Sequence, residues 1–358
     1  MRNSLEKLLV DNKKKIDNFK AQTDKVVVLG AGNTTELYAK CFEAEKIYVA
    51  GVVDNNPAKI GAIVLDKQVT PAKDVVKDYG NKVLVLISTA VNSTYDVLQE
   101  QMKVQELLCC GVDEYVFADH NEDILECFDS LEDVESKKIY QCVIIEHLTH
   151  KNMVPFPFME QYFACPEFLV PNGNEVFVDA GAYVGDSVER YIFNRAGVFG
   201  KVYAFEPDIT NFKAMEYRVD RLRREWALSD NVIELVPYGV GKENLEMTVK
   251  NNVQGLGSKL VEDDNSDGAT VRVVRLDDYF KEQKVDFIKA DIESFEYDML
   301  CGAEKIIRRD RPKLAICIYH NATDLYRTLL WIKKLNLGYC FKIRHHSVCH
   351  ADTVLYAY

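Results

Sequence analysis

Short apolar runs separated by helix-length amphipathic segments recur along the whole chain. The runs at 25–29 (KVVVL), 82–87 (KVLVLI), 176–179 (VFVD) and 314–319 (LAICIY) have strand length and no polar alternation. A continuous apolar run of this length predicts a strand that is buried on both faces. Because such strands alternate with helices, the sequence predicts an α/β fold with parallel sheets covered by helices.

In the N-terminal part, the pattern predicts a helix at 1–22 followed by a small Rossmann-like domain at 23–119. The elements expected in this domain are strands at 25–29, 47–53, 82–87 and 112–117 and helices at 34–44 and 95–108. Residues 120–170 combine an acidic helical pattern with a proline- and aromatic-containing stretch. So many aromatic side chains favour burial, so we expect a connector packed against both domains.

A second α/β pattern occupies 171–358, and its ending differs from that of a dinucleotide-binding fold. The last two strands, at 339–344 and 353–358, follow each other without a crossover helix, so they must pair antiparallel. A mostly parallel seven-stranded sheet closed by an antiparallel hairpin resembles the architecture of class I S-adenosylmethionine-dependent methyltransferases. The whole chain is therefore expected to hold two Rossmann-like domains.

Composition narrows the function classes. The chain has 44 basic and 56 acidic residues, a formal net charge of −12, which disfavours binding to nucleic acid or an anionic membrane. No apolar run approaches the roughly 20 residues of a membrane-spanning helix, and the N-terminus lacks the features of a signal peptide. None of the ten cysteines forms a C-x-x-C pair, so we expect free thiols, no structural zinc site and a cytoplasmic location.

The segment VFVDAGAYVGDS places a glycine-rich turn between a strand and a helix. Gly181 and Gly185 allow a sharp turn and a close approach of a ligand to the backbone. Glu206 ends the next strand, where its carboxylate can accept hydrogen bonds from ribose hydroxyls of either NAD or S-adenosylmethionine. Asp208 lies near the start of the following helix and fits a capping role equally well.

A third group of polar residues follows the strand at 287–290. Asp291 and Glu293 are separated by one residue, and period-two alternation would put both on the same side of the chain. Two carboxylates beside a ligand site can act as a general base, hold a cation or bind substrate hydroxyls. Glu293 or Ser294 can instead cap the helix that follows.

Seven segments in order resemble the FkbM-type methyltransferases over about residues 160–358. They are VFVDAGAYVGDS, VYAFEPD, LDDYF, IKADIESFEYDMLCGAEKII, LAICIYH, FKIRHHS and DTVLYAY. The resemblance implies a class I fold, S-adenosylmethionine as methyl donor, and an oxygen nucleophile on a sugar, a glycan intermediate or a natural product. The cofactor-binding residues that it implies are Asp179, Gly181, Ala182, Tyr183, Gly185, Asp186, Ser187, Glu206, Pro207, Asp208, Tyr238 and Gly239.

The same resemblance places Asp291, Glu293 and His320 at the reacting centre. A neutral hydroxyl is a weak nucleophile, so its proton needs an acceptor. His320 is the first candidate because the intrinsic pKa of histidine is about 6.5. Asp291 is the second, and a divalent ion held by Asp291 and Glu293 could instead acidify the hydroxyl, although the sequence indicates no metal site. One departure is Ser294, where the family pattern usually has glycine.

The remaining histidines and the N-terminal domain allow further interpretations. His147 and His150 are expected at the surface or at an interface. Gly30 and Gly32 follow the first strand and Asp54 follows Gly30 by 24 residues, near the spacing of a dinucleotide fingerprint.

Thr35 occupies the third glycine position of that fingerprint. The stretch nevertheless resembles small nucleotide- or sugar-binding domains of sugar-modifying enzymes. Binding of NAD or a nucleotide sugar, without methyl transfer, is therefore the alternative function. We expect instead that the domain selects a small-molecule or glycan acceptor or forms a homodimer face.

Overall fold

The computed structural model describes residues 1–89, 92–151, 153, 160–170, 172–251, 258–261, 269–347 and 351–358. The chain divides into two compact units. The N-terminal unit comprises Met1–Pro157, Tyr319–Leu330 and Ser347–Ala351, and the C-terminal unit comprises Phe158–Ile318, Trp331–His346 and Asp352–Tyr358. The first division falls inside the segment 120–170, and the limits proposed for that connector stay a prediction.

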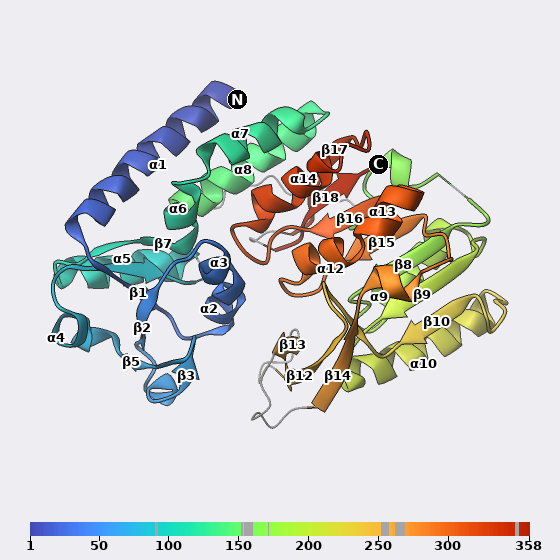
Figure 1. Cartoon of the computed structure of the whole chain (residues 1–358), viewed down its shortest axis with the longest axis horizontal. Helices are drawn as coiled ribbons and strands as arrows, with labels where there is room; N and C mark the ends of the chain where they lie inside the picture. The colour runs from blue at the N-terminus through green and yellow to red at the C-terminus, as the bar shows by residue number, and fades with distance from the viewer. Residues whose placement is uncertain are drawn as a thin grey trace. The chain divides into compact units, whose positions relative to one another are not determined.

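The N-terminal unit is built on a parallel sheet whose strand order is β5-β2-β1-β6-β7 (Figure 1). These strands are β1 (Lys25–Leu29), β2 (Val49–Asp54), β5 (Thr70–Pro71), β6 (Val83–Ile87) and β7 (Leu108–Gly111), and a small hairpin pairs β3 (Ile63–Val64) with β4 (Lys67–Gln68). After β1 the chain first adds β2 and β5 toward one edge of the sheet, and then adds β6 and β7 toward the other edge. The carboxyl ends of β1 and β6 therefore form the topological switch point, the place where such sheets bind ligands.

The helices of this unit confirm most of the predicted ones. They are α1 (Arg2–Gln22), α2 (Asn33–Leu37), α3 (Ala39–Ala44), α4 (Val75–Tyr79), α5 (Asn92–Val104), α6 (Val112–Phe117), α7 (Asn121–Ser130) and α8 (Val134–Thr149). The strand predicted at 112–117 is wrong, because that segment is α6 and the last strand is β7. Gly111 donates its backbone N–H to Glu114 Oε1 at 2.9 Å, which helps to start a helix directly after β7.

The C-terminal unit contains a larger sheet of order β10-β9-β8-β15-β16-β18-β17, with seven strands among the described residues. They are β8 (Val176–Ala180), β9 (Lys201–Phe205), β10 (Ile233–Val236), β15 (Phe287–Ala290), β16 (Lys313–Cys317), β17 (Phe341–His345) and β18 (Thr353–Ala357). Strand β18 runs opposite to the other six described strands of this sheet, because it pairs antiparallel with both β16 and β17. The α/β class predicted from the sequence is confirmed.

The remaining elements of the C-terminal unit connect the strands of its large sheet along the chain. A smaller sheet has the order β11-β14-β12-β13, from β11 (Gly239–Val240), β12 (Leu245–Asn251), β13 (Ser258–Val261) and β14 (Ala269–Val274). The helices are α9 (Asp186–Asn194), α10 (Ile209–Glu225), α11 (Leu276–Tyr279), α12 (Glu296–Gly302) and α13 (Glu304–Asp310), while α14 (Asp324–Lys334) contributes residues to both units. The switch point of the large sheet lies between β8 and β15.

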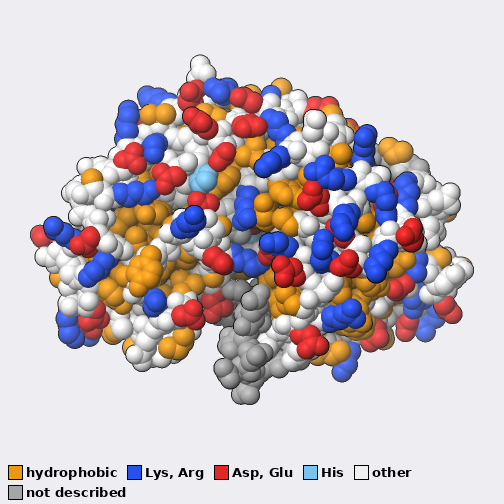
Figure 2. All heavy atoms as spheres, in the orientation of Figure 1, with side chains coloured by type: hydrophobic (Ala, Val, Ile, Leu, Met, Phe, Trp, Pro, Cys, Tyr) orange, Lys and Arg blue, Asp and Glu red, His pale blue; other side chains and the backbone are white. Residues whose placement is uncertain are grey.

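The surface mixes charged and apolar side chains (Figure 2), and the described cysteines are unbridged. Figure 2 shows acidic and basic side chains interspersed with apolar ones over the face that it draws. Within the described part of the chain, no helix combines the length and apolar character needed to cross a bilayer. The nine described cysteines are free thiols, as predicted, and Cys349 lies outside the described residues.

Candidate functional site

The turn after β8 has a backbone shape that requires glycine at its first position. Gly181 has φ +77°, and a Cβ placed there would stand 1.9 Å from the backbone oxygen of Asp291. Gly185 has φ +80° and is the N-cap residue that precedes α9. The backbone N–H groups of Gly181 and Ala182 both donate to the carbonyl of Phe205, at 3.0 and 2.9 Å. The turn is thus held between β9 on one side and the end of β15 on the other.

Glu206 follows β9 and holds the same turn through its carboxylate. Tyr183 donates its backbone N–H to Glu206 Oε2, and Asp208 donates its backbone N–H to Oε1, both at 2.9 Å. Burial raises the pKa of Glu206 to about 7, although these two hydrogen bonds act in the opposite direction. The carboxylate has further lone pairs with which it can accept ligand hydroxyls.

Asp208 caps a helix. Its Oδ1 accepts hydrogen bonds from the backbone N–H groups of Thr210 and Asn211, at 2.8 and 3.0 Å, at the start of α10. The capping interpretation of Asp208 is therefore confirmed. A contact with cofactor from the same side chain stays a prediction.

A buried ion pair lies beneath the glycine turn. Asp179 in β8 and Lys289 in β15 are register partners, and Lys289 Nζ lies 2.9 Å from Asp179 Oδ1. Lys289 also donates to the carbonyl of Gly181 at 2.6 Å, while Ser187 donates to Asp179 Oδ2 at 2.5 Å. Burial opposes the charged form of Lys289, but the carboxylates of Asp179 and Asp291 raise its pKa overall. These contacts support a positioning role for Asp179, and its direct contact with a cofactor stays a prediction.

Sequence reasoning missed Lys289, although one signal was present. It is the lone charged side chain in the apolar strand run FIKA, which is buried throughout. A lysine at such a position is rarely buried unless it is paired. Its partner could not be named from the sequence, because Asp179 lies 110 residues away.

Asp291 follows β15 and meets a residue from the segment that the sequence placed in the connector. Tyr162 donates its hydroxyl to Asp291 Oδ2 at 2.6 Å, and its backbone N–H donates to the hydroxyl of Tyr356 at 3.0 Å. Lys289 Nζ lies 5.0 Å from the centre of the Tyr162 ring. Tyr162 is therefore a second site residue that the sequence analysis missed, and it orients the candidate base Asp291.

The segment after Asp291 does not continue as a strand. The strand ends at Ala290, and Glu293 and Ser294 have φ +53° and +73°. The alternation argument that placed Asp291 and Glu293 on one side is therefore wrong, because it needs extended backbone. Positive φ at Ser294 also gives a physical reason for the glycine that the family pattern has there.

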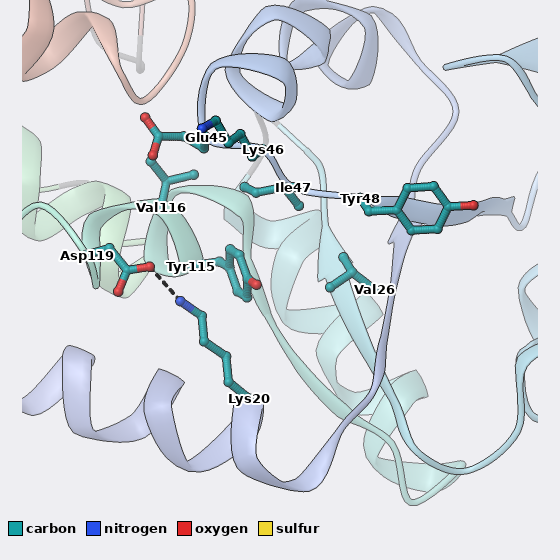
Figure 3. Close-up of a pocket in the computed structure, with 9 residues that line it drawn as sticks. All are labelled: Lys20, Val26, Glu45, Lys46, Ile47, Tyr48, Tyr115, Val116 and Asp119. Atoms are coloured by element: carbon teal, nitrogen blue, oxygen red, sulfur yellow. Dashed lines mark hydrogen bonds and ion pairs between the residues drawn. The ribbon is translucent and has the colours of Figure 1, made fainter.

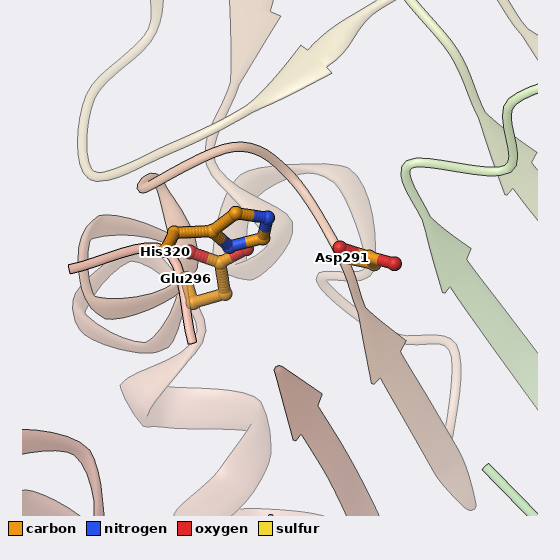
Figure 4. A group of neighbouring side chains, drawn as sticks. All are labelled: Asp291, Glu296 and His320. Carbon is orange, nitrogen blue, oxygen red and sulfur yellow. The ribbon is translucent and has the colours of Figure 1, made fainter. Parts of the chain in front are cut away.

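A different carboxylate, Glu296, begins α12 and is fully buried. Its Oε1 accepts the backbone N–H of Ile292 at 2.7 Å, so it braces the turn after β15. Figure 4 shows Asp291 at the end of β15 and Glu296 on α12, and it also labels His320 in the segment after β16. The roles proposed for Asp291, Glu293 and His320 stay predictions.

The other predicted site residues differ in burial and in the element that carries them. His320 is buried and belongs to the segment 319–330 of the N-terminal unit. Tyr238 is half-buried beneath the guanidinium of Arg272, at 5.2 Å from its ring centre, and Gly239 begins β11. Ala182 is buried in the turn, Asp186 is the first residue of α9, and Pro207 lies between Glu206 and Asp208.

The predicted surface or interface position of His147 and His150 is wrong, because both side chains are largely buried inside the N-terminal unit. Their side chains, on and just after α8, are only 8% and 10% exposed. His147 Nδ1 lies 2.5 Å from Asp113 Oδ2, and His150 Nε2 lies 3.0 Å from Glu114 Oε1. Burial opposes the charged form of His147, but Asp113 raises its pKa overall. The two histidines thus fix α8 against α6 inside the N-terminal unit.

A small cavity of about 140 Å³ lies in the N-terminal unit, near the amino ends of β1 and β2 (Figure 3). Three of its polar side chains contact one another. Lys20 Nζ lies 2.6 Å from Asp119 Oδ2 and 4.5 Å from the centre of the Tyr115 ring. Ligands of parallel sheets bind at the carboxyl ends of the strands, so we assign this cavity no functional role.

Comparisons with known proteins agree with the geometry of the C-terminal unit. Residues 179–341 match the family model described as methyltransferase FkbM domain. The crystal structure of a methyltransferase FkbM from Methylobacillus flagellatus KT is similar over 99% of this chain and 97% of that chain, with 21% sequence identity and a TM-score of 0.58. At this identity the structural match shows the fold alone.

A second solved structure covers only part of the chain. An rRNA methylase from Streptococcus thermophilus matches 53% of this chain and 90% of its own, with 17% identity and a TM-score of 0.35. The chain matches no curated protein sequence. Residues 179–341 are therefore a domain of the FkbM methyltransferase type.

Proposed function

We propose that the protein is an S-adenosylmethionine-dependent methyltransferase that methylates a hydroxyl group of a sugar, a glycan intermediate or a natural product. The observation that carries the proposal is the carboxylate of Glu206, which two backbone N–H groups hold beside the glycine turn. An acid at this position of a parallel sheet accepts hydrogen bonds from a ribose.

The residues around the turn fit such a nucleoside. Gly181 brings the backbone of the turn close to Asp291, while Glu206 offers its remaining lone pairs to the ribose hydroxyls. Lys289 holds the carbonyl of Gly181, so the turn is shaped before a ligand arrives. S-adenosylmethionine, when bound, supplies a methyl group on a positively charged sulfur.

The acceptor hydroxyl needs a group that removes its proton. Asp291 Oδ2 accepts the hydroxyl of Tyr162, so this carboxylate is oriented, and a carboxylate can accept a proton. We propose His320 as the first candidate and Asp291 as the second. Holding the hydroxyl in line with the transferred methyl group can lower the barrier by roughly 7–11 kcal/mol.

Calorimetry with S-adenosylhomocysteine tests the cofactor site. We expect Glu206→Ala to weaken binding at least tenfold, since a hydrogen bond to a charged group contributes about 1.5–3 kcal/mol. Asp54→Ala, which removes the acid after β2 in the N-terminal unit, and Glu234→Ala, which removes a half-exposed carboxylate of β10, should leave this affinity unchanged. Equal loss in Glu206→Ala and Asp54→Ala would contradict the assignment.

Turnover tests the choice of base. Mass spectrometry of candidate glycans and hydroxylated metabolites, with a gain of one methylene mass as the readout, identifies an acceptor. We then expect His320→Ala to lower the rate at least a hundredfold while the affinity for S-adenosylhomocysteine stays within about twofold. An unchanged rate in His320→Ala would remove this histidine as the base and leave Asp291 as the next candidate.

A further inference from the structure

The N-terminal unit repeats the skeleton of the candidate cofactor site around its own switch point. Gly30 follows β1 as Gly181 follows β8, with φ +117°, and a Cβ there would stand 2.5 Å from the backbone oxygen of Ser88. Ser88 follows β6 and donates its backbone N–H to the carbonyl of Leu29 at 2.9 Å. Asp291 makes the corresponding bond to Ala180 in the C-terminal unit, at 3.1 Å.

Asp54, at the end of β2, corresponds to Glu206. The backbone N–H of Ala31 donates to Asp54 Oδ2, and the backbone N–H of Asn56 donates to Oδ1, both at 2.7 Å. The same pattern of one bond from the turn and one from two residues onward holds Glu206. The Asp54 carboxylate therefore lies ready beside the turn with lone pairs left for a ligand hydroxyl.

Two further groups distinguish this place from its counterpart. The hydroxyl of Ser88 is buried, with the residue 7% exposed, and it has no hydrogen-bond partner among the described residues. The Cβ of Ser88 lies 3.8 Å from the position that a Gly30 Cβ would take, so the side chain stands beside the turn. A buried hydroxyl without a partner is destabilising, and a ligand that bonds to it would remove that cost.

The second group is the ammonium of Lys59. Its Nζ lies 3.6 Å from Asp54 Oδ2 and 3.4 Å from the position that a Gly32 Cβ would take, so it stands over the turn. The Lys59 side chain is 40% exposed, and it can therefore turn toward a ligand. An ammonium beside a glycine-rich turn suits a phosphate group.

From this juxtaposition we propose that the N-terminal unit binds a nucleotide. Asp54 accepts the ribose hydroxyls, and Lys59 and Ser88 donate to the phosphate. Thr35, at the third glycine position of the fingerprint, is no obstacle, because its side chain is buried and donates to the carbonyl of Gly30 at 2.5 Å. This site is separate from the one proposed for S-adenosylmethionine and does not depend on it.

Calorimetry on the full chain tests the proposal with ADP, UDP, adenosine, uridine and inorganic phosphate as probes. We expect ADP or UDP to bind with a dissociation constant below about 1 mM, and at least tenfold more tightly than either nucleoside or phosphate alone. Lys59→Gln and Asp54→Asn should each weaken this binding at least tenfold, and Ser88→Ala at least threefold.

Two controls make each outcome decisive. Lys67→Gln, which removes a half-buried lysine of β4 in the same unit, should leave nucleotide binding within about twofold. The far-UV circular dichroism spectrum, measured on every variant, should stay unchanged and reports that each chain is folded. The proposal is overturned if neither nucleotide binds, if phosphate or nucleoside alone binds as tightly, or if Lys67→Gln weakens binding as much as Lys59→Gln.

Discussion

In both units a carboxylate bonds the glycine turn, but the residues paired in the two central strands differ. Glu206 and Asp54 each bond a backbone N–H of the turn. Beneath the C-terminal turn lies the buried pair of Asp179 and Lys289. The corresponding register partners in the N-terminal unit are two apolar residues, Val28 and Leu86, both buried.

This difference indicates that the buried charges of Asp179 and Lys289 serve a purpose other than stability. A buried ion pair is often no more stabilising than a well-packed apolar pair of similar size. The N-terminal unit shows that a turn of this kind forms over apolar residues. We therefore interpret Lys289 as a residue that positions the carbonyl of Gly181 for the reaction site.

The largest effect should follow from breaking the buried pair. Lys289→Leu leaves the carboxylate of Asp179 buried without its cation, so we expect the free energy of unfolding to fall by about 3–5 kcal/mol in chemical denaturation. The double variant Asp179→Val/Lys289→Leu copies the N-terminal arrangement and should regain most of that loss. If the double variant also bound S-adenosylhomocysteine as tightly as the natural chain, the positioning role would be refuted.

The glycine turns themselves give the next largest effect. Gly181→Ala combines a positive φ with a Cβ that stands 1.9 Å from a backbone oxygen, and we expect a loss of about 3 kcal/mol. Gly30→Ala should cost a similar amount in the N-terminal unit. Gly338→Ala is the matched control, since its φ is +80° but its Cβ would meet nothing within 4 Å. A loss in Gly338→Ala as large as in Gly181→Ala would show that close approach is not the cause.

The pH dependence of cofactor binding should be smaller. Burial raises the pKa of Glu206 to about 7, so the carboxylate gains its full acceptor capacity only as the pH rises through that value. We expect the affinity for S-adenosylhomocysteine to increase up to about tenfold per pH unit between pH 5 and 7, and then to level off. Glu206→Gln should bind weakly with a flat profile, and a natural chain with a flat profile would contradict the prediction.

Protein stability should show the opposite trend over the same range. The folded state keeps the proton on Glu206 from about pH 4.5 to about 7, where the unfolded state has lost it. The contribution of Glu206 to the free energy of unfolding is therefore present at low pH and declines as the pH rises to about 7. Denaturation of the natural chain and of Glu206→Gln across this range measures that contribution.

The smallest effect concerns the turn after β15. Ser294 has φ +73°, and its buried hydroxyl has no partner among the described residues. We expect Ser294→Gly to raise the free energy of unfolding by about 0.5–1 kcal/mol, because glycine adopts this conformation without strain. Ser229→Gly, at an exposed turn without positive φ, should lower it slightly. A loss of stability in Ser294→Gly would show that the serine makes a compensating contact.

Local patterns in the sequence determined the parallel N-terminal sheet, the mostly parallel C-terminal sheet, the glycine turn at 181–185, and Glu206 at the end of the next strand. These features depend on residue spacing within single strands and turns, which the chain shows directly. The strand predicted at 112–117 is wrong because the apolar residues of β7 and α6 follow each other closely. The helix start is marked by the backbone N–H of Gly111, which donates to the carboxylate of Glu114.

Only the tertiary structure decided which distant side chains meet. Lys289 pairs with Asp179, Tyr162 with Asp291, and His147 with Asp113, across separations that no local period spans. Apart from Asp291, these residues are buried, and a buried polar group is stable only with a partner of matching charge or hydrogen-bonding capacity. The sequence shows that such a partner must exist, but the folding of the sheets selects which residue it is.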